Sequence, residues 1–278
     1  MKLYVCYHKS FPEPHGEIFQ PIQVGKKNSK VALPMIGDDS GDNISEKNIS
    51  FCELTATYWI WKNVHEDIVG LFHYRRYLNL RTKDTKFHCF TDDFAETYGL
   101  KAEHIRKLLQ RYDVLLPVQL PRRIKDSRPS VYQGYAAEHV VKDMDCMLAV
   151  LTQKYPEMEE TAKKVLKDGK QSYMTNILVA RKELFDEYAA WLFDILFEVE
   201  RQSQQDVATR DSYQRRAYGF LAERMMKIFI VYKQQTVGLK VAEFPMLYYE
   251  TDTVKWLKYQ WKHWMRYIRQ CFSRQSKI

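Results

Sequence analysis

Short apolar runs that alternate with longer amphipathic stretches constrain the fold of this chain more than any other feature. Each run is too short for a helix and is bounded by charged or turn-forming residues, which is typical of buried parallel strands. The runs are "KLYVCYH", "IVGLFHY" and "DVLLPVQ". Helical periodicity covers residues 50–64, 101–112, 136–155 and 182–202. This order predicts an α/β fold.

The length and cysteine content bound the class of protein. A chain of 278 residues with 45% hydrophobic side chains can bury one large core. The five cysteines are odd in number and include no Cys-x-x-Cys pair, which favours neither a disulfide framework nor a thiolate zinc site. No stretch approaches the ~18 uncharged apolar residues of a membrane-spanning helix, and no signal-peptide core is present. We expect a cytoplasmic protein.

The net charge of +8 is concentrated at the C-terminus. Residues 253–278 carry seven Lys and Arg side chains and no acid, which leaves +1 for residues 1–252. A basic body for nucleic acid is therefore not indicated. We predict one catalytic body over residues 1–252 and a basic amphipathic helix over residues 253–278.

The stretch "GLFHYRRYL" places polar and cationic groups directly after a predicted strand. Ligands of open α/β sheets gather at the carboxyl ends of strands. The guanidinium groups of Arg75 and Arg76 match phosphate oxygens, and His73 beside them can exchange a proton near neutral pH. With Tyr74, these residues predict a diphosphate site. The alternative is that the arginines pair with the acidic loop at residues 38–46.

The loop "GDDSGDNISEKN" at residues 37–48 precedes a predicted helix whose N-terminal amides can hold an anion. Asp42, Asn43 and Lys47 are candidate contacts to a ligand. Alternatively, Ser50 or Asn48 caps the helix and the acids serve its dipole. For Glu53, farther along the same stretch, the sequence favours neither a structural nor a functional role.

Three further side chains are candidates for a pocket. Tyr135 and His139 lie four residues apart on one predicted helical face, where they can reach a ligand or serve as packing groups. Glu223 lies in an apolar helix, where burial favours a raised pKa and a role as general base. Pairing with a neighbouring arginine is the alternative for Glu223, and His73 and Asp211 are rival bases.

Three stretches resemble a bacterial family of capsular-polysaccharide and O-antigen glycosyltransferases, long catalogued as a domain of unknown function. They are "GLFHYRRYL", "GDDSGDNISEKNISFCELTATYWIWKN" and "NILVARKELFDEYAAWLFDIL". The resemblance covers most of residues 3–232 and implies a GT-A-like, Rossmann-type sheet flanked by helices. It also implies inverting transfer of a sugar, galactofuranose from UDP-galactofuranose, to a growing surface glycan. Asn176 enters its strand as a related Asn does in similar transferases, which implies a donor contact. With such a function, the loop residues at 42–47 are candidate contacts to the nucleotide or donor sugar, and Tyr135 and His139 are candidate contacts to an acceptor sugar.

Many GT-A enzymes hold a divalent cation with an Asp-x-Asp motif after a central strand, and this chain has His-Tyr-Arg-Arg there instead. We therefore expect that Arg75 or Arg76 supplies the positive charge and that no cofactor is required. Mn²⁺ or Mg²⁺ binding stays open. Its candidate ligands are Asp38, Asp39 and Asp42, the acids of "TDD" at residues 91–93, and Asp143 and Asp145, which we expect on a solvated helix face.

The tail has the pattern of a helix that lies in a membrane interface. Its predicted apolar stripe comprises Leu257, Trp261, Trp264, Ile268 and Phe272, and its basic face comprises Lys255, Lys258, Lys262, Arg266 and Arg269. Packing of this stripe on the body or on a second subunit is the alternative.

The expected partners are a UDP-linked donor, a lipid-linked glycan acceptor and an anionic membrane surface. We expect no nucleic-acid partner. This combination places the protein peripherally on the inner face of the plasma membrane. The competing function is a non-catalytic binder of phosphates or RNA.

Overall fold

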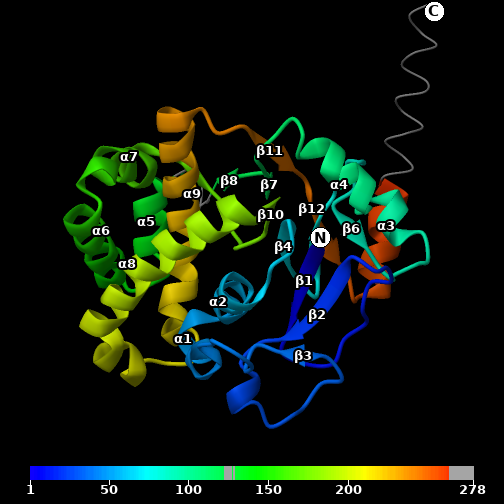
Figure 1. Ribbon diagram of the computed structural model, residues 1–278, viewed down its shortest axis with the longest axis horizontal. Coiled ribbons are helices and arrows are strands. Elements are labelled where there is room, and N and C mark those ends of the chain that lie inside the picture. The colour runs from blue at the N-terminus through cyan, green and yellow to red at the C-terminus, as the bar shows by residue number, and fades with distance from the viewer. Residues whose placement is uncertain (122–126, 128, 263–278) are drawn as a thin grey trace, which may run out of the picture.

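The structure is a computed structural model that describes residues 1–121, 127 and 129–262. A mixed sheet runs through its centre (Figure 1). The strands of this sheet are β1 (Lys2–Tyr7), β2 (Phe19–Gln23), β3 (Ile36–Gly37), β4 (Ile68–His73), β5 (Arg76–Leu78), β6 (Lys86–Phe87), β7 (Val114–Pro117), β10 (Leu178–Arg181), β11 (Val241–Phe244) and β12 (Met246–Tyr249). A separate small ribbon pairs β8 (Leu120–Pro121) with β9 (Gln171–Ser172).

The order of the main strands is β11-β7-β10-β4-β1-β2-β3. Strand β1 is parallel to β2 on one side and to β4 on the other, with Cys6 opposite His73. The chain therefore builds outward in both directions from β1, which makes the carboxyl ends of β1 and β4 a topological switch point. Strand β10 is antiparallel to both β4 and β7.

Helices cover both faces of the sheet (Figure 1). The longer ones are α2 (Leu54–Asn63), α6 (Val141–Lys154), α8 (Lys182–Thr209) and α9 (Ala217–Val237). The shorter ones are α1 (Asn48–Phe51), α3 (Phe94–Thr97), α4 (Ala102–Leu108), α5 (Val131–Ala136) and α7 (Glu159–Lys163). Single turns are η1 (Lys26–Asn28), η2 (Ser45–Lys47), η3 (Pro156–Met158), η4 (Lys164–Asp168) and η5 (Gln214–Arg216).

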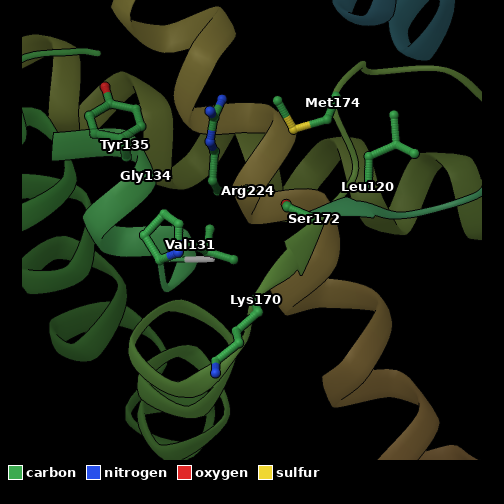
Figure 2. A pocket seen from close by; sticks show the side chains of 9 residues that line it. Leu120, Val131, Gly134, Tyr135, Lys170, Ser172, Met174 and Arg224 are labelled. Carbon is green, nitrogen blue, oxygen red and sulfur yellow. The ribbon is translucent and has the colours of Figure 1, made fainter. Parts of the chain in front are cut away.

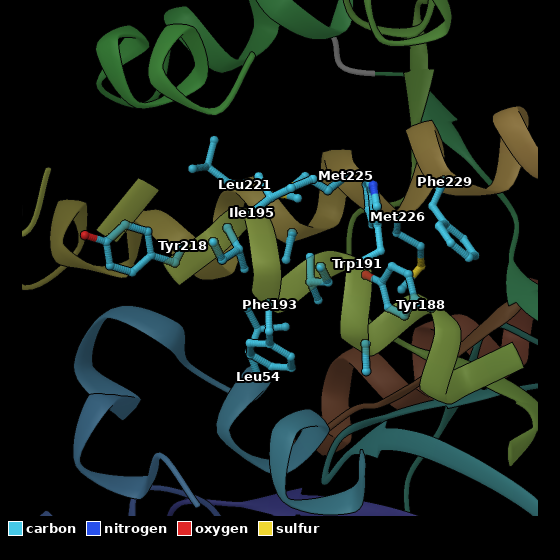
Figure 3. Close-up of a cluster of buried hydrophobic side chains, with 14 of the residues drawn as sticks. Leu54, Tyr188, Trp191, Phe193, Ile195, Tyr218, Leu221, Met225, Met226 and Phe229 are labelled. Carbon is cyan, nitrogen blue, oxygen red and sulfur yellow. The ribbon is translucent and has the colours of Figure 1, made fainter. Parts of the chain in front are cut away.

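The alternation of side chains along each strand divides the interior into two cores. On β1, Tyr4 and Cys6 enter the core formed with α2, α6, α8 and α9, whereas Val5 and Tyr7 enter the core on the opposite face. Figure 3 shows the first core, where Trp191, Phe193 and Phe229 pack between α8, α9 and the end of α2. His73 follows Val69 and Leu71 on β4 and therefore points toward this first core.

The predicted strands and most predicted helices are confirmed. The runs at residues 2–8, 68–74 and 113–119 are β1, β4 and β7, and they point in one direction. The predicted helix at 50–64 differs, because it breaks at Cys52 into α1 and α2. The predicted helix at 136–155 begins later, at Val141.

The beginning of the predicted tail helix is present at residues 253–262, and the rest of the predicted helix, with its Trp264, Arg266, Ile268, Arg269 and Phe272, lies outside the described residues. The Trp256 ring stacks on His88 at 6.0 Å, and the Thr85 backbone N–H donates to the Tyr259 hydroxyl. Leu257 and Trp261 are each 61% exposed. None of the described helices is both long and apolar enough to cross a bilayer.

Candidate active site

A cleft of about 530 Å³ opens at the carboxyl ends of β1 and β4, which is the switch point of the sheet. All four residues of the His-Tyr-Arg-Arg motif line it. The complete lining is Cys6, His8, Val24, Asn48, Ile49, Cys52, Glu53, His73, Tyr74, Arg75, Arg76, Ser212, Arg216 and Glu223. Segments that are far apart in the sequence therefore meet at one site.

Three guanidinium groups give one part of the cleft a positive charge. Arg75 and Arg76 follow β4, and Arg216 ends η5 just before α9. Arg75 lies over the Tyr74 ring at 5.1 Å, and Arg76 lies 6.0 Å from the Tyr248 ring. Within the described ranges, none of the three forms an ion pair with a carboxylate. Unpaired arginines in a concave site favour binding of an anion.

The acids of the loop at residues 38–46 have other contacts, so the alternative pairing of the arginines with this loop is not found. Asp38 is fully buried and accepts hydrogen bonds from the backbone N–H groups of Gly25 and Lys26 and from the Ser45 hydroxyl. Asp39 pairs with Lys26 at 3.7 Å. These contacts join the loop to η1 and fix its shape.

The three loop residues proposed as ligand contacts lie outside the cleft lining. Asp42 accepts a hydrogen bond from the Tyr58 hydroxyl, and the Asn43 amide donates to the Gly41 carbonyl. Lys47 binds the Glu200 carboxylate at 2.7 Å. Their assignment as substrate-binding residues stays a prediction, while their neighbours Asn48 and Ile49 do reach the cleft.

The break between α1 and α2 presents Glu53 to the cleft. Cys52 has φ 53° and ψ −134°, a conformation that non-glycine residues rarely adopt and that costs about 1–3 kcal/mol. The Asn48 amide and the Thr55 hydroxyl both donate to the Cys52 carbonyl, at 2.7 and 3.1 Å. Arg216 Nε donates to Cys52 Sγ at 3.2 Å. These contacts hold the strained residue in place.

The Glu53 carboxylate joins two predicted site residues. Asn176, which is 2% exposed, donates from Nδ2 to Glu53 Oε1 at 2.8 Å. The same oxygen lies 3.5 Å from His73 Nε2. At that separation the buried Nε2 makes no hydrogen bond, and its other described surroundings offer it no partner. Asn176 therefore reaches the site through Glu53 and is absent from the lining itself.

The charge state of His73 reflects opposing effects. Burial lowers the pKa of His73, the Glu53 carboxylate opposes that effect, and Arg76, Arg216 and His8 lower the pKa further. Burial and the neighbouring cationic groups therefore favour the neutral imidazole.

Glu223 lines the cleft from α9, as the proposed role of general base requires. Burial raises its pKa to about 7, against the lowering effect of Arg224, whose Nη1 donates to Glu223 Oε2 at 2.6 Å. Glu53 also raises the pKa of Glu223 by repulsion. The predicted pairing with an arginine is thus present, and the carboxyl still titrates near neutral pH. The rival base Asp211 accepts hydrogen bonds from two backbone N–H groups and does not line the cleft.

Tyr135 and His139 do not line the cleft, and Tyr135 instead lies next to Arg224. Tyr135 is 1% exposed and lines a second, smaller pocket with Arg224, whose guanidinium is 5.2 Å from the phenol ring (Figure 2). His139 packs on Tyr135 and stacks on Phe220 at 4.1 Å. Adjacent residues of α9, Glu223 and Arg224, therefore face different pockets. An acceptor contact by Tyr135 or His139 stays a prediction.

The expectation of a solvated helix face for the "DMD" motif is wrong for Asp143, whereas Asp145 is exposed as expected. Asp143 lies in the first turn of α6, is 3% exposed, and accepts two hydrogen bonds from Arg210 at 2.6 and 2.8 Å. Asp145 accepts a hydrogen bond from Tyr132 on the exposed side. Across the described residues, no three His, Cys, Asp or Glu side chains are grouped as a metal ion requires.

Sequence reasoning missed His8, Asn48, Cys52, Ser212 and Arg216 as lining residues, and assigned no role to Glu53. His8 had a usable signal, because it directly follows the first predicted strand. Arg216 had none beyond its charge, because only the tertiary fold brings η5 to the end of β4.

Comparisons with known proteins identify the family and support the fold. A family model described as "Domain of unknown function (DUF4422)" matches residues 2–235. A solved structure described as the apo structure of WbbM, a bifunctional glycosyltransferase, is similar with a TM-score of 0.82 and 33% sequence identity. The match covers 90% of this chain and 45% of that chain, so this chain spans less than half of the larger protein. No curated protein matches. The predicted α/β class, a central sheet flanked by helices, is confirmed.

Proposed function

This chain belongs to the family described as a domain of unknown function, DUF4422, and from that premise we propose that it is a glycosyltransferase. It moves a sugar from a nucleotide-linked donor to a glycan acceptor. The observation that carries the proposal is a set of three arginines at the switch point of the sheet, none of which pairs with a carboxylate in the described part of the chain. The similarity to a bifunctional glycosyltransferase supports it independently.

The cationic part of the cleft suits a nucleoside diphosphate. Transfer of a sugar leaves negative charge on the departing diphosphate, and preorganised positive groups lower the energy of that state. Arg75, Arg76 and Arg216 supply such groups without a metal ion. We assign the diphosphate to this part of the cleft, with Tyr74 as a wall of the same site.

Glu223 is the proposed general base. The acceptor hydroxyl must lose its proton as it attacks, and a base is most effective when its pKa lies near the working pH. The raised pKa of Glu223, about 7, and its place in the cleft support this role. Direct displacement by the activated hydroxyl inverts the configuration at the transferred sugar.

The GT-A-like class, the donor and the acceptor follow from the resemblance of the sequence to surface-glycan transferases. The proposed donor is UDP-galactofuranose, and the proposed acceptor is a growing, lipid-linked polysaccharide of the capsule or O-antigen type. The location at the inner face of the plasma membrane follows from such an acceptor. A screen of nucleotide sugars with UDP release as the readout tests the donor.

The same screen, repeated in excess EDTA, tests metal independence. A thermal-stability measurement tests the competing function. An arginine-based site keeps most of its activity in excess EDTA, whereas a hidden metal site loses it and regains it with Mn²⁺ or Mg²⁺. Thermal stabilisation by UDP, compared with that by RNA, separates a transferase from an RNA-binding protein. If no sugar nucleotide is consumed and RNA alone stabilises the chain, the transferase proposal is wrong.

Residues 253–262 support the proposed contact with an anionic membrane. Val254, Leu257 and Trp261 are 60–61% exposed on this helix, and three lysines accompany them. Trp256 and Tyr259 contact the body and orient the helix. An exposed apolar face next to basic side chains is the pattern of an interfacial helix, and it would bring the cleft to a lipid-linked acceptor.

A further inference from the structure

We propose that Glu53 is a positioning residue for His73, and that it enables His73 to bind a proton when a nucleoside diphosphate enters the cleft. The imidazolium then adds a fourth positive group to the three arginines. This inference deepens the proposed function and rests on it for the identity of the ligand. Nothing in the sequence marks Glu53 for this role.

The contacts form a chain from the buried core to the cleft. The Asn176 amide donates to Glu53 Oε1 at 2.8 Å, and that oxygen lies 3.5 Å from His73 Nε2. Because Asn176 is buried, it fixes where the carboxylate can lie. A small movement of either side chain completes a hydrogen bond from Nε2–H to Glu53 and satisfies a buried nitrogen that has no hydrogen-bond partner among the described residues.

The strained backbone at Cys52 indicates that the place of Glu53 matters. A positive φ outside glycine persists only where surrounding contacts enforce it, and such residues cluster at functional sites. Here Asn48, Thr55 and Arg216 enforce it. Gly219 leaves room for the turn, because a Cβ there would lie 3.1 Å from Cys52 Sγ.

The surroundings of His73 act on its pKa in opposite directions. Glu53 favours its protonated form, whereas burial and the nearby cationic side chains oppose it. The titratable and charged groups that line the cleft around His73 are Cys6 in β1, His8 after β1, Glu53 between α1 and α2, Arg75 before β5, Arg76 in β5, Arg216 in η5, and Glu223 in α9.

A bound diphosphate reverses this balance. Its negative charges offset the arginines, so Glu53 and the diphosphate together favour the imidazolium. His73 then takes one proton from the solvent and its charge changes from 0 to +1. The charged ring donates from Nε2 to Glu53 and presents its other N–H to the cleft. No bond is made or broken in this step apart from that to the proton.

Histidine NMR with UDP as the probe tests the proposal directly. The His73 signal is assigned by its loss in His73→Asn and titrated with and without saturating UDP in the wild type, Glu53→Gln and the control Glu183→Gln, an exposed acid of α8. UDP is expected to raise the pKa of His73 by about 1 or more in the wild type. Glu53→Gln is expected to lower the pKa of His73 in both states, and the control is expected to change neither.

Proton uptake gives a second measurement. Calorimetry of UDP binding in buffers of different ionisation enthalpy should show uptake on the order of one proton at pH 7 for the wild type, and less for Glu53→Gln. If Glu53→Gln fails to fold, Glu53→Asp replaces it, because Asp keeps the charge but moves it away from His73 by one methylene. The pKa of His73 in Glu53→Asp should lie between those expected for the wild type and for Glu53→Gln.

The possible outcomes separate the inference from the proposed function. If UDP binds while the pKa of His73 stays unchanged, or if Glu53→Gln leaves that pKa where it was, the inference is overturned and the transferase proposal stands. If UDP does not bind, the proposed diphosphate site is wrong. In that case the pKa of His73 without ligand, compared between the wild type and Glu53→Gln, still shows whether Glu53 controls the protonation of His73.

Discussion

Asn176 and Glu53 are 123 residues apart in the sequence and are joined by a hydrogen bond of 2.8 Å at the floor of the cleft. Asn176 precedes β10, and Glu53 lies at the break between α1 and α2. The same amide lies 3.4 Å from the Gly219 carbonyl on α9, to which it also donates. One buried side chain therefore ties together the strand and the helices that surround the proposed diphosphate site.

The first prediction follows from this bond. Asn176→Ala leaves the Glu53 carboxylate without its fixed donor, so we expect turnover to fall by up to about 10²-fold through misplacement of the site. Steady-state UDP release measures the effect, and thermal melting separates it from unfolding. Thr175→Ala is the matched control, because Thr175 is equally buried and its hydroxyl has no described partner. Equal losses in both variants would mean a packing role only.

The arginines after β4 give the second prediction. Replacement of Arg75 or Arg76 by Ala removes one preorganised positive group, and we expect turnover to fall by about 10² or more. The fold should survive, because neither side chain makes an ion pair within the described residues. Arg81→Ala, which breaks an exposed pair with Glu96, is the control and should leave turnover unchanged. Near-normal UDP release by both cleft variants would exclude these arginines from the mechanism.

The third prediction concerns pH. The pKa of Glu223 is raised to about 7 by burial, so the carboxyl is protonated, and inactive as a base, below that pH. Turnover should therefore rise with pH up to about pH 7, and it should fall again at higher pH, where the nucleotide-bound His73 loses its proton. Glu223→Gln should remove that rise together with most of the activity. A pH profile of turnover from pH 5 to 9 measures both, and an unchanged profile in the variant would assign the base elsewhere, with His73 as the next candidate.

The fold could be predicted from the sequence to a large extent, because local patterns determine it. The runs that became β1, β4 and β7 are apolar at every position that enters one of the two cores. The position of the His-Tyr-Arg-Arg motif in the cleft follows from the rule that ligands gather at strand ends.

The rest of the site depends on tertiary contacts that no local pattern encodes. The segment around Cys52 contains neither Gly nor Pro, so it reads as one continuous helix. Contacts from Asn48, Thr55 and Arg216 impose the break and thereby place Glu53. Asp143 was misassigned for a similar reason, because its partner Arg210 is 67 residues away.

That buried pair gives the fourth prediction, which concerns stability. Asp143→Ala removes the bidentate partner of the Arg210 guanidinium, which is 9% exposed and keeps an ion pair with the more exposed Asp206, so we expect the free energy of unfolding to fall by up to about 3–5 kcal/mol. Urea denaturation measures it. Replacement of both residues by apolar ones, Asp143→Leu with Arg210→Met, should recover much of the loss. Glu159→Gln, in an exposed pair with Lys163, should change stability far less. If the double variant is no better than the single one, an unpaired charge is not the cause.

The last prediction concerns the helix at residues 253–262. Leu257 and Trp261 are each 61% exposed, whereas Trp256 and Tyr259 hold the helix against the body. Replacement of Leu257 and Trp261 by Ser should therefore weaken sedimentation with anionic liposomes without unfolding the chain. Lys255, Lys258 and Lys262 each contribute about 1 kcal/mol near an anionic surface, so binding should also weaken as salt rises.

Val237→Ser is the matched control for this experiment, because Val237 is 64% exposed at the end of α9 and does not belong to the helix at residues 253–262. Turnover of a soluble acceptor should be the same in all three proteins, since the substitutions lie outside the cleft. If the wild type does not sediment with anionic liposomes at low salt, the helix is not a membrane contact. If the double variant instead changes the oligomeric state seen in sedimentation velocity, the exposed apolar side chains bind a second copy of the chain.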